Sequence, residues 1–227
     1  MAAAVCLIFP LPGDVTGVAF DPFGVEVMRA MAPGRPEEDH LEGTLESVFA
    51  SASGPVLCAT SQGGWGWPML ADSLAFRESR PWLPIILESG VIRVGPYIRP
   101  PDAPCFRCRR RRQLQHAEDT PQAVVDAETQ PVFRKAPYTG AYLPFHVRLA
   151  AAAAGVQLRS DARETDPSRG ATVTSISLFP VTVSQQTLLP WAGCETCGRP
   201  APLRPSAALA GIAARLSGAR VGEEVPR

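Results

Sequence analysis

Apolar and polar positions along the first ninety residues predict short buried strands separated by helices. Three apolar runs are typical of buried strands: residues 3–9, 55–60 and 83–87. Three further stretches carry apolar side chains at the three- and four-residue spacing of an amphipathic helix: residues 24–32, 38–52 and 69–79. Strands that alternate with helices favour parallel pairing, so this half of the chain predicts an α/β core.

The second half of the chain predicts a sheet of mixed direction. Residues 91–98 follow the strand at 83–87 so closely that the two are expected to pair antiparallel. A basic stretch at 107–115 and an alanine-rich stretch at 142–158 predict helices. Residues 171–179 and 181–189 are rich in β-branched side chains and predict two strands, or one long bent strand broken at Pro180. The expected fold class is therefore α/β, with a mixed sheet and helices on its faces.

Composition narrows the class of protein. With 227 residues and 45% hydrophobic content, the chain can form one core domain with an appended segment. The 22 basic and 22 acidic residues give a formal net charge of zero, which disfavours a nucleic-acid partner or a membrane surface. No apolar run approaches the roughly 20 residues that a membrane helix needs, and the N-terminus lacks the basic region of a signal peptide. A cytoplasmic protein is expected.

Four of the six cysteines form two Cys-x-x-Cys pairs, which are Cys105 with Cys108 and Cys194 with Cys197. In a reducing compartment such pairs are better explained by a metal or redox site than by disulfides. Zinc prefers four tetrahedral ligands, and two pairs that each follow a strand-like run favour one zinc ion that clamps distant segments together. The alternative is a redox dithiol, which normally opens a helix after a strand and does not occur in two copies. Because a site with four cysteines has no open position, the zinc is expected to be structural.

A run of arginines follows the first cysteine pair, comprising Arg107, Arg109, Arg110, Arg111 and Arg112. These residues predict either an anion site for a partner, such as phosphate or an acidic surface, or a solvated helix face beside the zinc. The three histidines show no metal-ligand spacing, and no residue set has the pattern of a catalytic constellation. The chain is therefore expected to be a non-catalytic component, although its status as an enzyme stays open.

Residues 55–108 and 171–198, a little over a third of the chain, resemble the C-terminal part of ThiF-type, ubiquitin-activating-enzyme-like proteins. The most similar subgroup comprises the cyclodehydratase partner proteins of azoline-forming peptide biosynthesis. Their pattern is a strand, a helix, a strand pair, Gly-Pro, an arginine- or proline-rich turn and Cys-x-x-Cys, and this chain matches it with PVLCAT, WLPIIL, VIRVGPYIRP and PCFRC. The later Cys-x-x-Cys-Gly is matched by CETCG. The resemblance implies a truncated ThiF-like α/β core with a structural zinc held by Cys105, Cys108, Cys194 and Cys197.

The nucleotide-binding motif of the family is missing. A ThiF-type enzyme needs Gly-x-Gly-x-x-Gly between its first strand and helix, so that backbone can approach phosphate. Here the first strand leads into PLPGDVTG, and the glycine-rich turn at 63–66 follows a later strand, so it is interpreted as an exposed loop. The chain is therefore expected to be a shortened relative without adenylation activity.

These observations predict three regions and one principal function. The regions are a degenerate N-terminal half of the core at 1–54, a ThiF-like core with the zinc clamp at 55–200, and a C-terminal helix (205–216) and tail at 201–227. The expected function is that of a non-catalytic partner in the biosynthesis of ribosomally synthesised thiazole/oxazole-type peptides, including bacteriocins and antibiotics. It would bind precursor peptide, a YcaO-type cyclodehydratase, or both, and a homodimer would be compatible with the resemblance. The alternatives are an active ATP-dependent adenylating enzyme with an atypical site, and a zinc-dependent nucleic-acid module that uses Arg107–Arg112.

Overall fold

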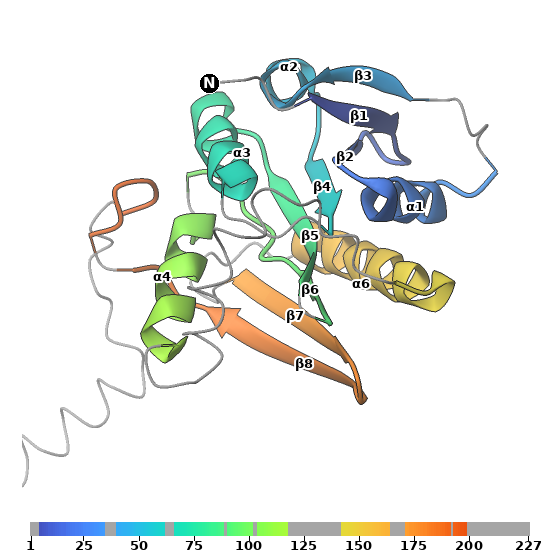
Figure 1. The fold of residues 1–227 in the computed structure, drawn as a ribbon. Helices are drawn as coiled ribbons and strands as arrows, with labels where there is room; N and C mark the ends of the chain where they lie inside the picture. The colour runs from blue at the N-terminus through green and yellow to red at the C-terminus, as the bar shows by residue number, and fades with distance from the viewer. Residues whose placement is uncertain are drawn as a thin grey trace, which may run out of the picture.

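The protein folds around one mixed eight-stranded sheet (Figure 1). The computed structural model describes residues 5–34, 40–61, 66–88, 90–101, 104–117, 142–163, 171–191 and 193–198. Across the sheet the strands follow the order β3 (Leu41–Thr44), β1 (Val5–Pro10), β2 (Thr16–Ala19), β4 (Val56–Thr60), β5 (Trp82–Glu88), β6 (Val91–Val94), β7 (Ala171–Leu178) and β8 (Val181–Leu188). The helices are α1 (Pro22–Met31), α2 (Leu45–Ser51), α3 (Gly66–Glu78), α4 (Phe106–Ala117) and α6 (Pro144–Arg163). The expectation of a mixed α/β fold is confirmed.

The first strand does not open a parallel strand–helix–strand unit, as the sequence pattern had suggested. β1 reverses direction at residues 11–15 and pairs antiparallel to β2, with Phe9 opposite Gly17. Gly13 and Asp14 adopt positive φ angles of 74° and 58° in this turn, which allows the reversal within a few residues. The strand that pairs in parallel with β4 is β2, which is only four residues long and lacks the apolar run that marks the other core strands.

The single helix predicted for residues 38–52 is also wrong. Residues 41–44 form β3, which pairs antiparallel to β1, and only then does α2 begin. Thr44 is the N-cap of α2, and its side chain accepts a hydrogen bond of 3.2 Å from the Ser47 N–H, while the Ser47 hydroxyl accepts one of 3.1 Å from the Thr44 N–H. This capping box, preceded by Gly43, stops the helical periodicity from extending backwards.

The centre of the sheet matches the sequence pattern closely. β4 and β5 are joined by α3 and pair in parallel, and β6 pairs antiparallel to β5. Side chains of β4 alternate between the two faces, so that Leu57 and Ala59 belong to one core and Val56 and Cys58 to the other. All four side chains are fully buried, which explains why this strand is a continuous apolar run.

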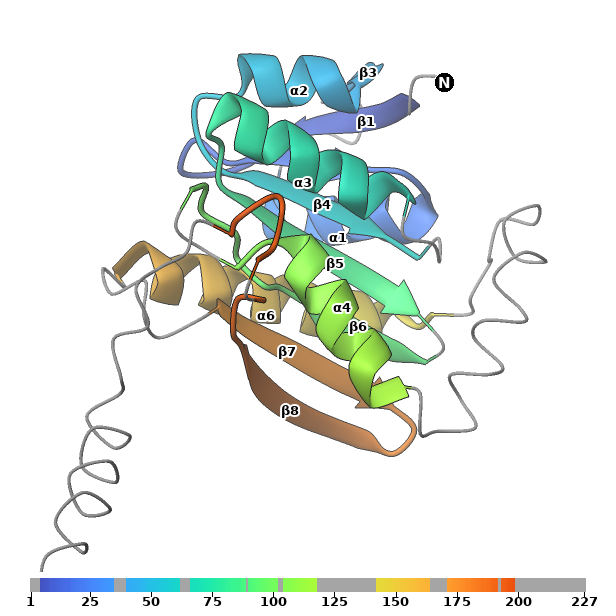
Figure 2. The same ribbon diagram turned by 90° about the vertical axis from the view of Figure 1, so that its left-hand side faces the viewer.

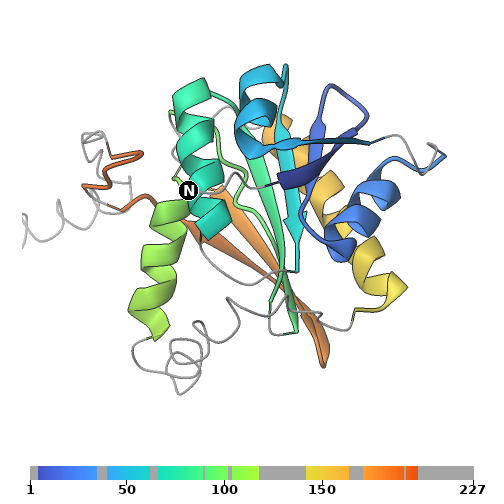
Figure 3. The same ribbon diagram turned by 45° about the horizontal axis from the view of Figure 1, so that its top comes forward.

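Helices cover both faces of the sheet (Figure 3). α1 and α6 lie on one face, where Phe23 and Ala150 are fully buried in the first core. α2, α3 and α4 lie on the other face, where Phe49, Trp82 and Phe106 are fully buried in the second core. The alanines of α6 keep this helix close to the sheet because they leave little side chain between the two layers.

Strands β7 and β8 form a hairpin that turns at Phe179 and Pro180, so of the two predicted alternatives the pair of strands is correct. β8 is an edge strand, and Val181–Thr187 are all exposed. The described parts of residues 1–54 and 55–200 share one sheet, and the helix predicted at 205–216 lies outside the described residues. Within the described residues, no helix combines the length and the hydropathy needed to cross a membrane.

Candidate metal centre

Cys105 and Cys108 lie at the start of α4. The N–H groups of Cys108 and Arg109 both donate to the Cys105 carbonyl, at 3.1 and 3.3 Å, and so form the first turn of the helix. Asp72 on α3 is only 2% exposed and caps this turn by accepting a hydrogen bond of 2.9 Å from the Phe106 N–H. Burial raises the pKa of Asp72 to about 6, although the Phe106 hydrogen bond favours the carboxylate. The position of the first cysteine pair is thus fixed by α3.

Cys194 and Cys197 lie in the loop that follows β8. The Cys194 N–H donates to the Trp191 carbonyl at 3.1 Å, and the Gly198 N–H donates to the Cys194 carbonyl at 2.6 Å. Gly193 has a φ of 76°, a conformation that favours glycine, and a Cβ at Gly198 would overlap the backbone of Cys194. The resulting tight loop lies beside the start of α4 (Figure 2).

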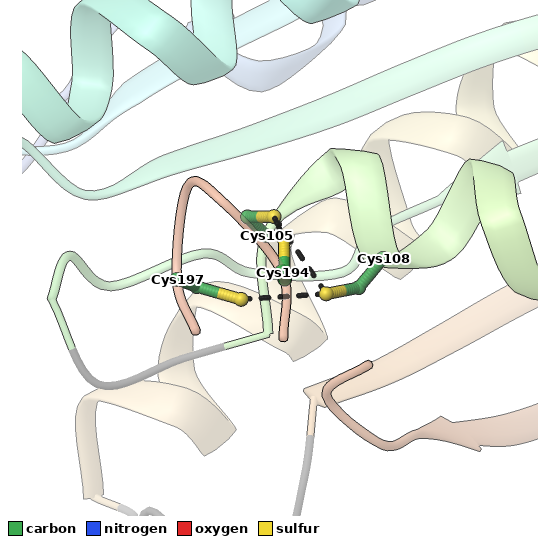
Figure 4. Close-up of side chains that lie close together, drawn as sticks. All are labelled: Cys105, Cys108, Cys194 and Cys197. Atoms are coloured by element: carbon green, nitrogen blue, oxygen red, sulfur yellow. Dashed lines mark hydrogen bonds between the residues drawn. The ribbon is translucent and has the colours of Figure 1, made fainter. Parts of the chain in front are cut away.

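The two pairs meet in one cluster (Figure 4). The Sγ–Sγ distances are 3.4 Å for Cys105–Cys194, 3.3 Å for Cys108–Cys197 and 3.7 Å for Cys105–Cys108. All four Sγ atoms lie within 4.8 Å of one another. Four sulfurs at about 2.3 Å from one tetrahedral zinc would be about 3.8 Å apart, whereas a disulfide would bring two of them to about 2.05 Å. All four are free thiols, so this arrangement can hold one metal ion.

Hydrogen bonds within the cluster shift the pKa values of Cys105 and Cys108 in opposite directions. Hydrogen bonds from the Cys105 and Cys197 thiols and from the Trp191 backbone N–H, 3.2 Å away, lower the pKa of Cys108. The same contact with Cys108 raises the pKa of Cys105. Because a metal binds thiolates, occupation of the site must release the remaining protons. With four protein ligands the site has no position for water or substrate, so a bound metal would stabilise the fold and would not react.

The structure separates the predicted arginine run into different environments. Arg107 forms an ion pair of 2.7 Å with Glu195, and Arg111 and Arg112 lie over the Trp191 ring, at 4.6 and 5.5 Å from its centroid. Together, Arg107 and Arg111 line a shallow hollow that also includes Cys108, Trp191, Cys194 and Glu195. Arg110 is half-buried.

Arg109 is not part of this surface. It is only 6% exposed, donates to the Gly95 carbonyl at 3.1 Å and lies 4.9 Å over the Phe106 ring. Burial, reinforced by the nearby charge of Arg93, lowers the pKa of Arg109 to about 9. Arg109 therefore joins α4 to the end of β6, a role that the sequence did not reveal.

The described histidine side chains lie apart from the cysteine cluster. His40 stacks on Phe9 with ring centroids 5.5 Å apart, and the buried His146 accepts a hydrogen bond of 3.0 Å at Nδ1 from the Leu143 N–H. The side chain of His116 lies outside the described part of the chain. The remaining cysteines are core residues, and burial raises the pKa of Cys6 to about 11.

A second polar site, missed in the sequence, lies at the carboxyl ends of the parallel strands β2 and β4. Asp21 is the N-cap of α1, and its Oδ1 accepts a hydrogen bond of 2.9 Å from the Gly24 N–H. Its Oδ2 accepts hydrogen bonds from the Thr60 hydroxyl at 2.5 Å, the Ser61 N–H at 2.6 Å and the Ser61 hydroxyl at 3.1 Å. The signal was Asp21-Pro22, an N-cap followed by proline at the first helical position. This signal follows β2, whereas the glycine motif is expected after the first strand of the chain.

This edge is where dinucleotide-type α/β folds bind phosphate, at a helix N-terminus that follows a glycine-rich turn. Ala19, Asp21 and Gly24 have the spacing of the three glycines in Gly-x-Gly-x-x-Gly. Gly24 lies at the third of these positions, where a Cβ would overlap the Ala59 carbonyl, so that only glycine lets α1 approach β4 this closely. Asp21 lies at the second position, and its carboxylate accepts hydrogen bonds from Gly24, Thr60 and Ser61. Of the glycine-rich turn at 63–66, only Gly66 is described, and it starts α3.

No protein-family description matches the sequence. No curated protein matches it. Among solved structures, a heterocyclase in complex with substrate and cofactor is 15% identical over 68% of this chain and 23% of its own, with a TM-score of 0.48. The heterocyclase TruD is 16% identical over 68% and 25%, with a TM-score of 0.47. E. coli MccB with MccA is 11% identical over 68% and 43%, with a TM-score of 0.48. The chain thus spans less than half of each of these structures, and likenesses this remote carry no functional conclusion.

Proposed function

We propose that this protein is a non-catalytic, zinc-stabilised partner in the biosynthesis of ribosomally synthesised thiazole/oxazole-type peptides. In this role it binds the precursor peptide, a YcaO-type cyclodehydratase, or both. The observation that carries the proposal is the position of Asp21, whose carboxylate caps the N-terminus of α1, where dinucleotide-type folds hold phosphate, and also accepts hydrogen bonds from Thr60 and Ser61. A nucleotide would have to displace this carboxylate or share the edge with its negative charge.

The cysteine cluster supports the zinc part of the proposal. Four cysteine sulfurs within 4.8 Å of one another are a ligand set typical of structural zinc. Cys105 and Cys108 would hold the ion from α4, and Cys194 and Cys197 from the loop after β8. Zinc would contribute only a cross-link between these segments, because its four positions are all taken by protein sulfur. One zinc per chain is the expected stoichiometry.

Partner binding rests on the sequence resemblance to cyclodehydratase partner proteins, which covers the strands and turns around both cysteine pairs. In the proposed complex, the YcaO-type enzyme carries out the ATP-dependent reaction, and this chain binds the partner or the peptide. This chain then has to keep a rigid binding surface, and a closed metal site on a mixed sheet provides that rigidity.

Calorimetric titration of the zinc-loaded protein with ATP and magnesium tests the proposal. We expect no heat of binding, no pyrophosphate exchange with peptides or amino acids, and capture of a YcaO-type enzyme or its precursor peptide in a pull-down. Magnesium alone is the control for heats of dilution. Tight ATP binding or pyrophosphate exchange would overturn the proposal in favour of an adenylating enzyme. A gel shift with nucleic acid at low salt would instead favour the nucleic-acid module.

A further inference from the structure

We propose that the exposed face of α4, together with Trp191, binds an acidic segment of a protein partner. The α4–Trp191 face comprises Arg107, Arg111, Arg112 and Trp191. This inference rests on the proposed role as a binding partner and specifies the chemistry of what is bound.

α4 carries a dense group of positive charges. α4 has the sequence FRCRRRRQLQHA, with five arginines and no acidic residue, whereas the whole chain has a formal net charge of zero. Arg109 points inward and is buried, but Arg111 is exposed and the side chain of Arg107 is 41% exposed. Like charges on neighbouring helical positions repel one another, so an acidic partner would relieve this repulsion.

Trp191 orders two of these guanidinium groups. Arg111 and Arg112 both lie over its ring, at 4.6 and 5.5 Å from the centroid. A guanidinium that lies over an aromatic ring uses its face for the ring and keeps its N–H edge for an acceptor. The backbone of Trp191 is held beside the cysteine cluster, because its main-chain N–H donates to Cys108 Sγ at 3.2 Å. Side chains ordered in advance lose less entropy when a ligand binds.

The same face already binds a carboxylate of this chain. Arg107 donates to Glu195 Oε2 at 2.7 Å, at the rim of the hollow that Arg111 and Trp191 also line. The Glu195 side chain is 84% exposed, and an ion pair this exposed to water contributes little to stability. An aspartate or glutamate of a partner could therefore replace Glu195 at little cost while also reaching Arg111.

Carboxylates fit this surface better than a nucleic-acid backbone does. Guanidinium groups bind carboxylates through paired N–H donors, and a short acidic segment needs only a few of them. A polyphosphate needs basic groups spread over an extended surface. The basic groups of the α4–Trp191 face come from one helix, the chain as a whole is neutral, and the acidic Glu195 lines the same hollow.

Fluorescence anisotropy with the full-length, zinc-loaded protein tests the inference. The probe is a labelled peptide rich in Glu and Asp, and the control probe has Gln and Asn at the same positions. We expect salt-sensitive binding of the acidic probe only. The double substitution Arg111→Gln with Arg112→Gln should weaken this binding by about tenfold or more, whereas Glu195→Gln should strengthen it. Arg148→Gln with Arg159→Gln, two exposed arginines on α6, is the matched control and should leave binding unchanged.

Zinc content and far-ultraviolet circular dichroism of each variant check that folding is intact. Trp191→Leu, which removes the ring beneath Arg111 and Arg112, should also weaken binding of the acidic probe. Equal affinity of the wild type and the α4 double variant, or no binding of the acidic probe by the wild type, would overturn the inference. Stronger competition by single-stranded DNA than by unlabelled acidic peptide would overturn it in favour of nucleic acid. These outcomes are independent of ATP binding and of YcaO capture, which test the proposed function.

Discussion

At the scale of single residues, the metal centre depends as much on its neighbours as on its cysteines. Asp72 caps the turn that carries Cys105, and the conformation of the second loop requires glycine at position 198. These contacts hold the backbone of both cysteine pairs in place from within the chain. Because the unfolded chain has no such site, a bound metal would favour the folded state.

Cysteine substitution tests this arrangement directly. Cys105→Ser or Cys194→Ser should release the metal and lower the free energy of unfolding by about 4 kcal/mol or more, since three thiolates no longer close the site. Metal content by mass spectrometry and urea unfolding would measure both effects. Cys6→Ala is the control, because Cys6 is a buried thiol outside the cluster and its substitution should leave the metal in place. Stoichiometric metal with unchanged melting in either serine variant would contradict the assignment.

His146 should make stability depend on pH. Burial lowers its pKa below the usual value, and its Nδ1 accepts the Leu143 N–H, which an imidazolium cannot do. Because the pKa of His146 is lower in the folded than in the unfolded state, neutral His146 contributes to the free energy of unfolding. This contribution is fully present above about pH 6.5 and is lost as the pH falls through the folded pKa. Unfolding free energies measured between pH 7 and pH 5 should fall more steeply for the wild type than for His146→Asn. Because the thiolates titrate in both proteins, equal slopes would rule out a role of His146.

At the scale of elements, Asp21 joins the start of α1 to the ends of two parallel strands. Asp21→Ala removes the helix cap and leaves the Thr60 and Ser61 donors without this acceptor, so we expect a loss of about 2–3 kcal/mol. Asp21→Asn keeps one acceptor oxygen and should lose about half as much. Urea unfolding would measure both, with the exposed Glu26→Ala on the same helix as the control, where the change should stay within about 0.5 kcal/mol. A loss as small as that of the control would show that the Asp21 network is not stabilising.

Elements with long apolar patterns could be predicted from the sequence, and the short ones could not. β4, α3 and β5 have long apolar patterns, so their order and parallel pairing followed from periodicity. β2 and β3 each have four residues and contain glycine, and tertiary pairing with β1 is what makes them strands. The same reason explains why residues 38–52 are not one helix. Their apolar periodicity does not show that Thr44 ends a strand and begins a shorter helix.

The candidate sites were predictable to different degrees for a similar reason. The Cys-x-x-Cys spacing is itself typical of a metal site, so the meeting of the two pairs could be expected. That the metal is zinc stays a prediction. Arg109 and Arg111 are near neighbours in one run, and only the direction in which the helix faces decides that one is buried and the other exposed. The Gly24 donor to Asp21 belongs to a local helix cap, but the Thr60 and Ser61 donors come from the end of β4, far away in the sequence, and no local pattern reveals them.

At the scale of the whole molecule, the cluster links α4 to the chain that follows the β7–β8 hairpin, so it closes a loop that contains α6 and this hairpin. Removal of the metal with a chelator should lower the melting temperature by about 10 °C, and restored zinc should reverse the change. Hydrogen exchange should show the protection lost first in α4 and residues 191–198. Identical melting curves before and after chelation would show that the cluster does not stabilise the fold.

A metal ion bound by these four thiols would also shift the equilibrium between the unfolded and the folded chain toward the folded state. An ion that binds the folded chain far better than the unfolded chain adds about 1.4 kcal/mol of stability for each tenfold rise in its free concentration above the dissociation constant. A substitution that destabilises the fold elsewhere, such as Gly24→Ala in the first turn of α1, would then be compensated by a higher metal concentration. The amount of folded protein would follow the free metal concentration of its surroundings.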